Sequence, residues 1–271
     1  MKISKRAYLY NLNKENRVKE RELETAVINC FNRNKGNYGR PRIKIQLASE
    51  GIHISEGKIG RILKENGLIA KAGRRKKQRK YKKTKEEILQ ENLILNRSLN
   101  DLKPDEIWSS DITEIKIRSN KLYLAGIIDV ASRKVIGYHI GTNMRQEIVH
   151  QAIKMAIHKT TSTEGIIFHS DRGSQYTSIE TQKLLKDNGI VSSMSRPGIP
   201  NDNQIVESLW NSIKTEIGSL TKCRKAEAIV EIHEYISNYY NIKRVHSGIG
   251  YLTPVEAYDQ LLYSSSNPSP E

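Results

Sequence analysis

Three consecutive segments decide the fold of this chain: EIWSSDITEIKIR (residues 106–118), KLYLAGIIDVA (121–131) and KVIGYHIG (134–141). Each is rich in Ile, Val or Tyr, which favour strands, and short SNK and SRK stretches at their junctions are turn signals. We therefore predict three antiparallel strands joined by hairpins.

Alternating helix and strand signals follow these hairpins. RQEIVHQAIKMAIHKT (145–160) has its apolar side chains on one helical face, and a helix is also predicted at about 178–188. GIIFHS (165–170) and GIVSSMS (189–195) read as strands, and a long helix begins at about 203. The order predicts an α/β core over 104–260, a mixed five-stranded sheet with flanking helices rather than an all-parallel Rossmann fold.

Residues 1–70 are predicted to form a small module of three helices. Pro41 suits the first turn of the second helix, Ser55 can cap the third, and Gly67 can end it. The third helix has one apolar face and three cations that project elsewhere: Lys58, Arg61 and Lys64. This is the layout of a helix-turn-helix that contacts DNA through its last helix, although an ordinary three-helix bundle with a charged exterior has the same periodicity.

Positive charge is concentrated between these two parts. KAGRRKKQRKYKKTK (71–85) contains ten of the Lys and Arg residues and no acid, in a chain of net charge +15. Such density favours a polyphosphate such as DNA, but a solvated linker or a targeting tract is the alternative. We assign 71–103 to a basic linker with these DNA-contacting residues: Arg74, Arg75, Lys76, Lys77, Arg79 and Lys80.

Composition points to a cytoplasmic protein. No apolar run approaches the roughly 18 residues of a membrane span, and the N-terminal residues lack the apolar stretch of a signal peptide. Cys30 and Cys223 form no CxxC pair and are interpreted as free thiols. The Ser- and Pro-containing residues 261–271 are predicted to be a disordered tail.

Three acids stand where chemistry can use them. Asp111 lies in mid-strand, Asp171 ends the fourth strand in HSDRGSQYTS (169–178), and Glu207 lies on the long helix. An aspartate within a strand is costly unless it is paired or coordinates an ion. At about 100° per residue, three polar side chains fall within about 40° of Glu207: Asn203, Asn211 and Lys214. A solvent-facing helix would carry the same stripe.

Phosphodiester chemistry requires such a set of acids. Two divalent ions about 4 Å apart share carboxylate ligands and act on both the attacking and the leaving oxygen. Ligation by oxygen alone favours Mg²⁺ or Mn²⁺ over zinc. Residue types and spacing therefore permit a two-metal phosphodiester site, and a structural helix remains the alternative.

Five motifs in order carry a family resemblance: WSSDITEI, YLAGIIDVASRKVIGY, HSDRGSQYTS, MSRPGIPNDNQIVESLWNSIKTE and YYNIKRVHSGIGYLTP. Together they resemble the DDE transposases of bacterial insertion sequences, of the OrfB type with a retroviral-integrase-like catalytic core. The resemblance covers roughly residues 37–258, and 35 residues separate Asp171 from Glu207, as is typical of that triad.

The resemblance implies a ribonuclease-H-like core in which Asp111, Asp171 and Glu207 hold two Mg²⁺ (or Mn²⁺) ions. It implies cleavage at the ends of an element and transfer of the freed 3′-hydroxyl to target double-stranded DNA. Lys214 matches a DNA-contacting position, and Arg244 and His246 match a motif assigned to DNA contact or to bracing the site. We expect DNA contacts from Asn203 and Asn211 as well.

Further expectations concern partners and rival functions. The resemblance implies a homo-oligomer on paired DNA ends, near the nucleoid, and a partner or fusion from an upstream reading frame. One rival is an inactive product that binds ends and regulates transposition; another is a nuclease that cuts without joining. Asp129 is interpreted as a turn residue and His169 as a hydrogen-bonded histidine at a strand end.

Overall fold

The fold was analysed in a computed structural model that divides into two compact units, Met1–Gly73 and Arg74–Glu271. The structure describes residues 5–71, 91–95, 97–98, 101–118, 120–196, 199 and 203–266, with side chains described between 18 and 264. The six predicted DNA contacts at 74–80 lie outside the described residues. Each unit is considered by itself below.

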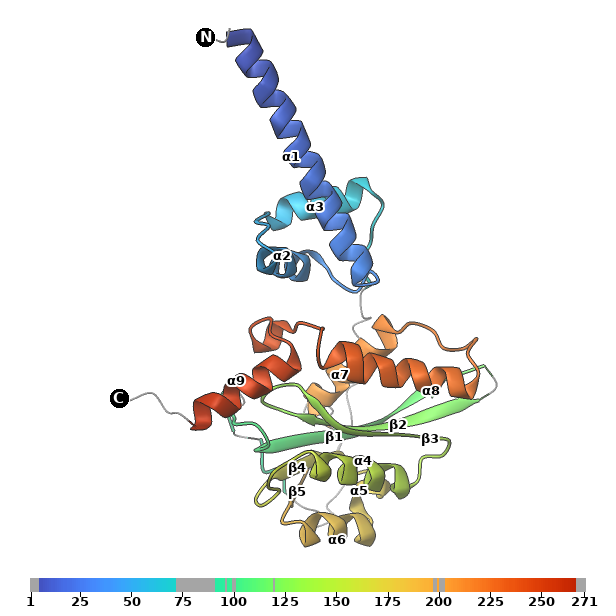
Figure 1. The fold of residues 1–271 in the computed structure, drawn as a ribbon. Helices are drawn as coiled ribbons and strands as arrows, with labels where there is room; N and C mark the ends of the chain where they lie inside the picture. Colours follow the sequence, from blue (N-terminus) through green and yellow to red (C-terminus); the bar gives the residue numbers. More distant parts are fainter. Residues whose placement is uncertain are drawn as a thin grey trace. The chain divides into compact units, whose positions relative to one another are not determined.

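The first unit contains three helices: α1 (Lys5–Arg33), α2 (Arg40–Ser49) and α3 (Glu56–Glu65). Pro41 occupies the first turn of α2, and the Ser55 hydroxyl accepts a hydrogen bond from the backbone N–H of Lys58 at 3.3 Å, as capping predicts. Both short helices pack against the C-terminal part of α1 through Val27, Ile43 and other fully buried apolar side chains. Figure 1 shows α1 continuing beyond this contact.

The second unit is built on a five-stranded sheet whose order is β3-β2-β1-β4-β5. Its strands are β1 (Ile107–Lys116), β2 (Lys121–Asp129), β3 (Val135–Gly141), β4 (Ile167–Ser170) and β5 (Val191–Met194). The first three strands pair antiparallel, whereas β1–β4 and β4–β5 pair parallel. The predicted mixed sheet is confirmed.

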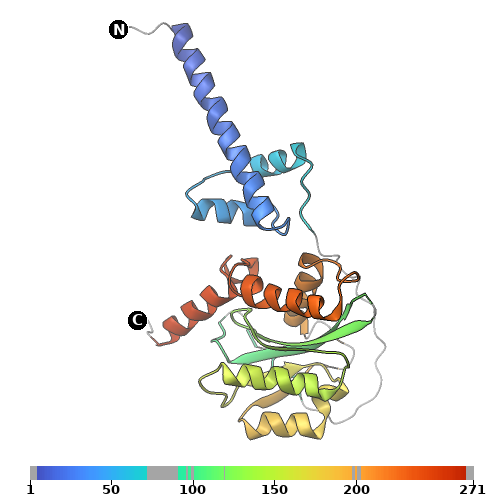
Figure 2. The ribbon, with the colours of Figure 1, turned by 45° about the vertical axis from the view of Figure 1, so that its right-hand side comes forward.

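Helices cover both faces of this sheet (Figures 1 and 2). One face carries α4 (Gln146–His158), α5 (Ser174–Thr177) and α6 (Ile179–Asp187). The other carries α7 (Gln204–Glu216), α8 (Lys225–Glu234) and the π-helix η2 (Tyr235–Tyr240). The chain then forms the 3₁₀ helix η3 (Ser247–Ile249) and α9 (Pro254–Ser266).

Two separate apolar clusters result because successive strand residues point to opposite faces. Leu124 and Ile128 pack toward α7 and α8, whereas Ala125 and Ile127 pack toward α4. A Cβ atom at Gly137 would lie 2.3 Å from the Ala152 carbonyl oxygen, so glycine permits α4 to approach β3 closely. The sheet is therefore buried on both faces and forms a rigid base for side chains at its strand ends.

Two predicted boundaries differ from the structure. The tail predicted to be disordered from residue 261 is helical as far as Ser266, because α9 continues to that residue, and only 267–271 lie outside the described part. The end of the predicted linker contacts the core, since the Leu93 N–H donates to Ser193 Oγ at 3.0 Å. Within the described ranges, no helix has the length and apolar character needed to cross a bilayer.

Candidate active site

Asp111 lies in the middle of β1, half-buried beneath α7. Its Oδ1 accepts a hydrogen bond from the backbone N–H of Ile112 at 2.8 Å. Its Oδ2 accepts one from the indole Nε1–H of Trp210 on α7, also at 2.8 Å. Both oxygens are therefore oriented by donors, and each retains a lone pair for a further ligand.

Trp210 reaches Asp111 because the neighbouring strand provides space for its ring. Gly126 is the β2 partner of Asp111, and a Cβ atom there would lie 2.5 Å from Trp210 Cη2. Trp210 belongs to the apolar side of α7, a position that by itself indicates only a core residue. The ring is indeed 6% exposed, but its N–H also positions a candidate catalytic group. A glycine inside a buried strand is a signal of close approach that could have indicated this contact.

Asp171 directly follows β4 and is exposed. Its Oδ1 accepts a hydrogen bond from the backbone N–H of Gly173 at 2.9 Å. The parallel pairing of β1 with β4 aligns Ser109 with His169, and continuing that register by two residues brings Asp111 level with Asp171. Adjacent strands lie about 4.8 Å apart, so the two aspartates project from neighbouring positions of the sheet.

Glu207 lies in the first turn of α7, whose start is tied to β1 by Asn203. The Asn203 Nδ2 donates to the Ser110 carbonyl at 3.0 Å, and its Oδ1 accepts from the Ser109 hydroxyl. Asn203 is buried, and these hydrogen bonds engage both polar atoms of its amide, which argues against the expected contact with DNA. Its observed role is to hold the helix that carries Glu207 beside the strand that carries Asp111.

The pKa of Asp111 reflects both its own burial and the charges of the two other acids. Burial raises the pKa of this carboxyl group to about 6, although the hydrogen bonds from Trp210 and Ile112 act in the opposite direction. The negative charges of Asp171 and Glu207 raise the pKa further. Across the described part of the chain, however, no three His, Cys, Asp or Glu side chains converge closely enough to enclose one metal ion.

A divalent cation fits this donor set. The three acids supply only oxygen ligands, which Mg²⁺ and Mn²⁺ prefer, and the site offers carboxylates of different exposure, with Asp111 at its buried side. A bound cation would offset both the burial cost at Asp111 and the repulsion from its neighbours.

Named bacterial transposases are similar to this chain over most of its length. The transposase for insertion sequence element IS904 of Lactococcus lactis subsp. lactis is 38% identical over 237 residues, 87% of this chain and 93% of that protein. The chain belongs to the insertion-sequence transposases. The transposase InsF for insertion sequence IS3A of Escherichia coli K12 is 31% identical over 242 residues, covering 85% of this chain and 80% of that one.

Family models divide the transposase as the fold does. An integrase core domain matches residues 101–200 and 188–254, and an HTH-like domain matches 18–77. The helix-turn-helix interpretation of the first unit is thereby confirmed. The crystal structure of the catalytic core domain of BIV integrase covers 60% of this chain and 99% of its own, with 22% identity and a TM-score of 0.47.

A buried ion pair supports the far end of α7 in the transposase. Arg244 is 5% exposed, and its guanidinium donates to both carboxylate oxygens of Glu216, with the shortest contact 2.7 Å. It also donates to Ser212 Oγ at 3.0 Å and contacts the His246 ring at 2.9 Å. Of the two roles expected for Arg244, this position supports bracing rather than DNA contact. His246 is half-buried beside it.

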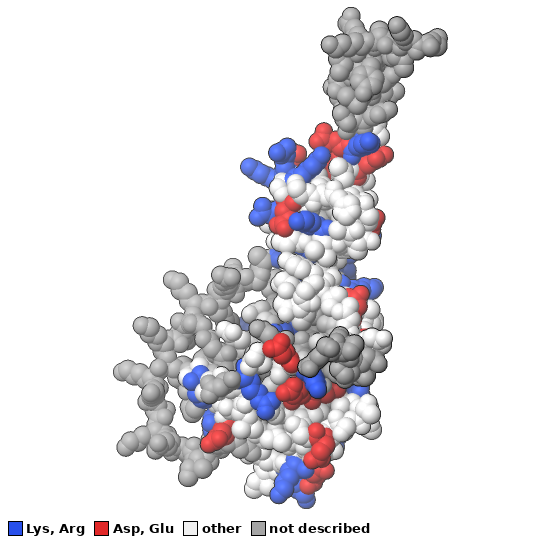
Figure 3. Space-filling model, turned by 90° about the vertical axis from the view of Figure 1, so that its left-hand side faces the viewer, with Lys and Arg blue, Asp and Glu red and all other residues white. Residues whose placement is uncertain are grey.

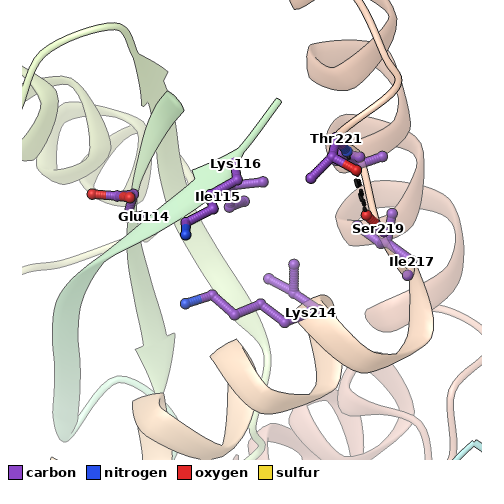
Figure 4. A pocket seen from close by; sticks show the side chains of 10 residues that line it. Glu114, Ile115, Lys116, Lys214, Ile217, Ser219 and Thr221 are labelled. Carbon is purple, nitrogen blue, oxygen red and sulfur yellow. Dashed lines mark hydrogen bonds between the residues drawn. The ribbon is translucent and has the colours of Figure 1, made fainter. Parts of the chain in front are cut away.

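The other predicted DNA-contacting residues that the structure describes lie on the surface of their units. Asn211 and Lys214 are exposed on α7, and Figure 4 shows the Lys214 side chain extending toward β1. Arg61 and Lys64 are exposed on α3, while the Lys58 ammonium lies 3.4 Å from Glu20. None of these positions obstructs a contact with DNA phosphates.

Two polar residues near the site have the structural roles that were predicted. His169 is fully buried, and its ring nitrogens lie 3.0 Å from the hydroxyls of Ser193 and Ser195. Asp129 accepts hydrogen bonds from the backbone N–H groups of Ser132 and Asp105 at 2.8 Å, which stabilises the turn after β2. Neither side chain is available to the three acids.

Proposed function

We propose that this transposase cleaves the DNA ends of its element and transfers the resulting 3′-hydroxyl to target DNA, using metal ions held by Asp111, Asp171 and Glu207. The observation that carries the assignment is the electrostatic setting of Asp111. Its carboxyl group is half-buried beside α7, burial raises its pKa to about 6, and the charges of the two other acids raise the pKa further. Such a setting is unfavourable for a structural acid and suits a cation ligand.

The proposal assigns two Mg²⁺ or Mn²⁺ ions to the three acids. When bound, such ions activate the attacking oxygen and stabilise the leaving oxygen of a phosphodiester. The protein's own residues supply orientation. Trp210 and the Ile112 N–H fix the carboxylate of Asp111, and the Gly173 N–H fixes that of Asp171. Asn203 anchors the first turn of α7, so that Glu207 faces the same region.

Recognition of DNA is assigned to several surfaces. Lys58, Arg61 and Lys64 of α3 would enter a groove of the element ends, as the last helix of such motifs does. Lys214 and Asn211 would contact DNA beside the acids, and the basic run at 74–80 would contact phosphates. We further propose a homo-oligomer on paired ends, a partner or fusion from an upstream reading frame, and a cytoplasmic location at the nucleoid.

The test uses short duplexes copied from the DNA that flanks the gene, with a pre-exposed 3′-hydroxyl at the suspected end. Purified protein is incubated with Mg²⁺ or Mn²⁺, and longer joined strands are measured beside an Asp171→Asn control. We expect joined products that require metal and are absent with the variant.

Other outcomes would contradict the proposal in distinct ways. Metal-dependent cutting without joined strands would identify a nuclease. Equal binding by both proteins without cutting or joining would favour the regulatory function, and a fusion with the upstream frame would then be compared in the same assay.

A further inference from the structure

Two segments far apart in sequence form one surface at the end of the sheet. They are the end of the β1–β2 hairpin (residues 116–118 and 120–121) and the connection between α7 and α8 (217–225). The Arg118 N–H donates to the Cys223 carbonyl at 3.1 Å, which joins the two segments. Within the turn, the Ile117 N–H donates to the Asn120 carbonyl at 2.9 Å. We call this region the hairpin–loop surface.

Cations dominate the hairpin–loop surface. Two adjoining hollows lie along it, the first lined by Lys116 and Lys214 (Figure 4) and the second by four further cations. Those four are Arg118, Lys121, Arg224 and Lys225. Lys222 is exposed on the same connection. Lys116, Lys121, Lys214 and Lys225 lie in strands or helices. The other three cations lie in the turn and the loop, which the hydrogen bond from Arg118 to Cys223 joins.

The acids near this surface are engaged locally. Glu114 is the one acid lining either hollow among the described residues, and its carboxylate lies 2.8 Å from the Lys121 ammonium. Glu227 accepts the backbone N–H of Arg224 at 2.8 Å and so caps α8. Elsewhere charges are mixed: Figure 3 shows Lys and Arg interspersed with Asp and Glu on the face drawn there. An excess of cations on one surface attracts a polyanion.

We propose that the hairpin–loop surface binds the sugar–phosphate backbone of target DNA away from the point of joining. The inference rests on the proposed function, because it takes Asp111 as the position of chemistry. The surface begins at Lys116, and the five residues of strand from Asp111 to Lys116 span roughly 17 Å at about 3.3 Å each, or about five base pairs of duplex. A target must extend at least that far to reach the surface.

Target DNA is favoured over the element's own ends for two reasons. Lysine and arginine contacts to phosphates carry no sequence information, which suits a duplex of arbitrary sequence. The element ends must be distinguished from other DNA, and the HTH-like unit provides a helix for that purpose. A target duplex also continues on both sides of the joining point, so it passes any cationic surface that flanks the site.

The test measures strand transfer by the full-length protein into targets of increasing length, about 8, 20 and 40 base pairs. With wild-type protein we expect the apparent KM for target to fall as the duplex becomes long enough to reach the surface. With the double variant Arg118→Glu/Arg224→Glu, the KM for the 40-base-pair target should rise roughly tenfold. The slope of log K for target binding against log salt concentration should also become shallower, by about one for each phosphate contact that is lost. Transfer into the shortest target should change least.

Matched variants separate this effect from charge and folding. Lys183→Glu/Lys186→Glu makes the same charge change at exposed positions of α6 and should retain wild-type length dependence. Arg118→Lys/Arg224→Lys should retain most target binding, because it preserves charge. Thermal unfolding of each variant identifies any that fails to fold.

Several results would contradict this inference without contradicting the proposed function. One is wild-type length dependence in Arg118→Glu/Arg224→Glu. Another is a loss of end cleavage in the absence of target, which would assign the surface to the element ends. A loss that is equal for all three target lengths would indicate a general effect on the site. If wild-type protein joins no strands at all, the proposed function itself has failed.

Discussion

Glu207 and Glu216 lie at opposite ends of α7 and have contrasting surroundings. Glu207 is exposed in the first turn, and its charge raises the pKa of another carboxyl group, Asp111. Glu216 is buried in the last turn, where it accepts hydrogen bonds from Arg244 and from the Tyr235 hydroxyl at 2.9 Å. Burial lowers the pKa of the Arg244 guanidinium, but Glu216 outweighs this effect and the pKa is raised.

The contrast shows how one helix serves two purposes. A buried acid with a structural role has its counter-charge supplied by the chain, as Glu216 does. At the other end of α7, the charges of Asp171 and Glu207 raise the pKa of Asp111, and in the proposed function a bound cation would offset this repulsion. One end of the helix therefore contributes stability, and the proposed function assigns the chemistry to the other end.

The largest difference is expected from one substitution made at each end of the helix. Glu207→Gln should reduce strand transfer by more than about a hundredfold and leave stability nearly unchanged. A loss of about a hundredfold is the upper limit for residues that only position a metal ligand, and a ligand itself should matter more. Glu216→Gln should instead lower the free energy of unfolding by about 3–5 kcal/mol, because Arg244 would remain buried without its counter-charge. Transfer assays and urea denaturation of both variants test the contrast, and equal losses of stability would contradict it.

The buried pair can be examined from its other side. Arg244→Met should destabilise the protein by about 3–5 kcal/mol, because it leaves the Glu216 carboxylate buried and unpaired. Adding Glu216→Leu should restore much of that stability, since an apolar pair of similar volume carries no buried charge. The measurement is a double-mutant cycle by urea denaturation. Strict additivity of the two substitutions would show that the pair is not coupled.

The two tryptophans allow a smaller effect to be isolated. Trp210→Phe removes the donor to Asp111 and should reduce strand transfer about 10- to 100-fold, as loss of groups that orient metal ligands does. Trp108 also donates one indole N–H, to Asp105 at 2.8 Å, but that contact is not to one of the three acids. Trp108→Phe should therefore leave transfer nearly unchanged at matched stability. A similar fall in both variants would refute a specific role for Trp210.

The smallest expected effect is on thermal stability in the presence of metal. A ligand that binds only the folded state stabilises it by about 2.7 kcal/mol at a hundred times its Kd. Saturating Mn²⁺ should therefore raise the Tm of the wild-type protein by several degrees, and Asp111→Asn should reduce the increase. Calorimetry with and without EDTA provides the measurement, and an equal shift in both proteins would place the metal elsewhere.

Much of the fold was predictable because its signals are local. The hairpins of β1 to β3, the apolar face of α4 and the Ser55 cap are each encoded within a few neighbouring residues. The start of the tail was predicted too early, at residue 261, because the segment contains Ser and Pro residues, whereas α9 continues to Ser266. Ala257, 3% exposed, anchors α9 through tertiary packing that composition does not reveal.

The three acids of the candidate site were predictable from the sequence, but the side chains that position them and stabilise α7 were not. Position in strands, helical periodicity and the family motifs all indicated Asp111, Asp171 and Glu207. The contact from Trp210 to Asp111 joins residues 99 positions apart, and the contact from Arg244 to Glu216 joins residues 28 apart. Such contacts depend on which elements become neighbours after folding. Helical periodicity can indicate that Trp210 is buried, but it cannot identify the acceptor of its N–H.

The position of Arg244 near the end of the chain has a consequence for prematurely terminated products. A chain that stops before this residue retains all three acids, yet Glu216 has lost its counter-charge. The cost of about 3–5 kcal/mol is a large part of the 5–15 kcal/mol that stabilises a typical folded protein. Nonsense fragments are therefore expected to unfold and be degraded before they can damage the host chromosome.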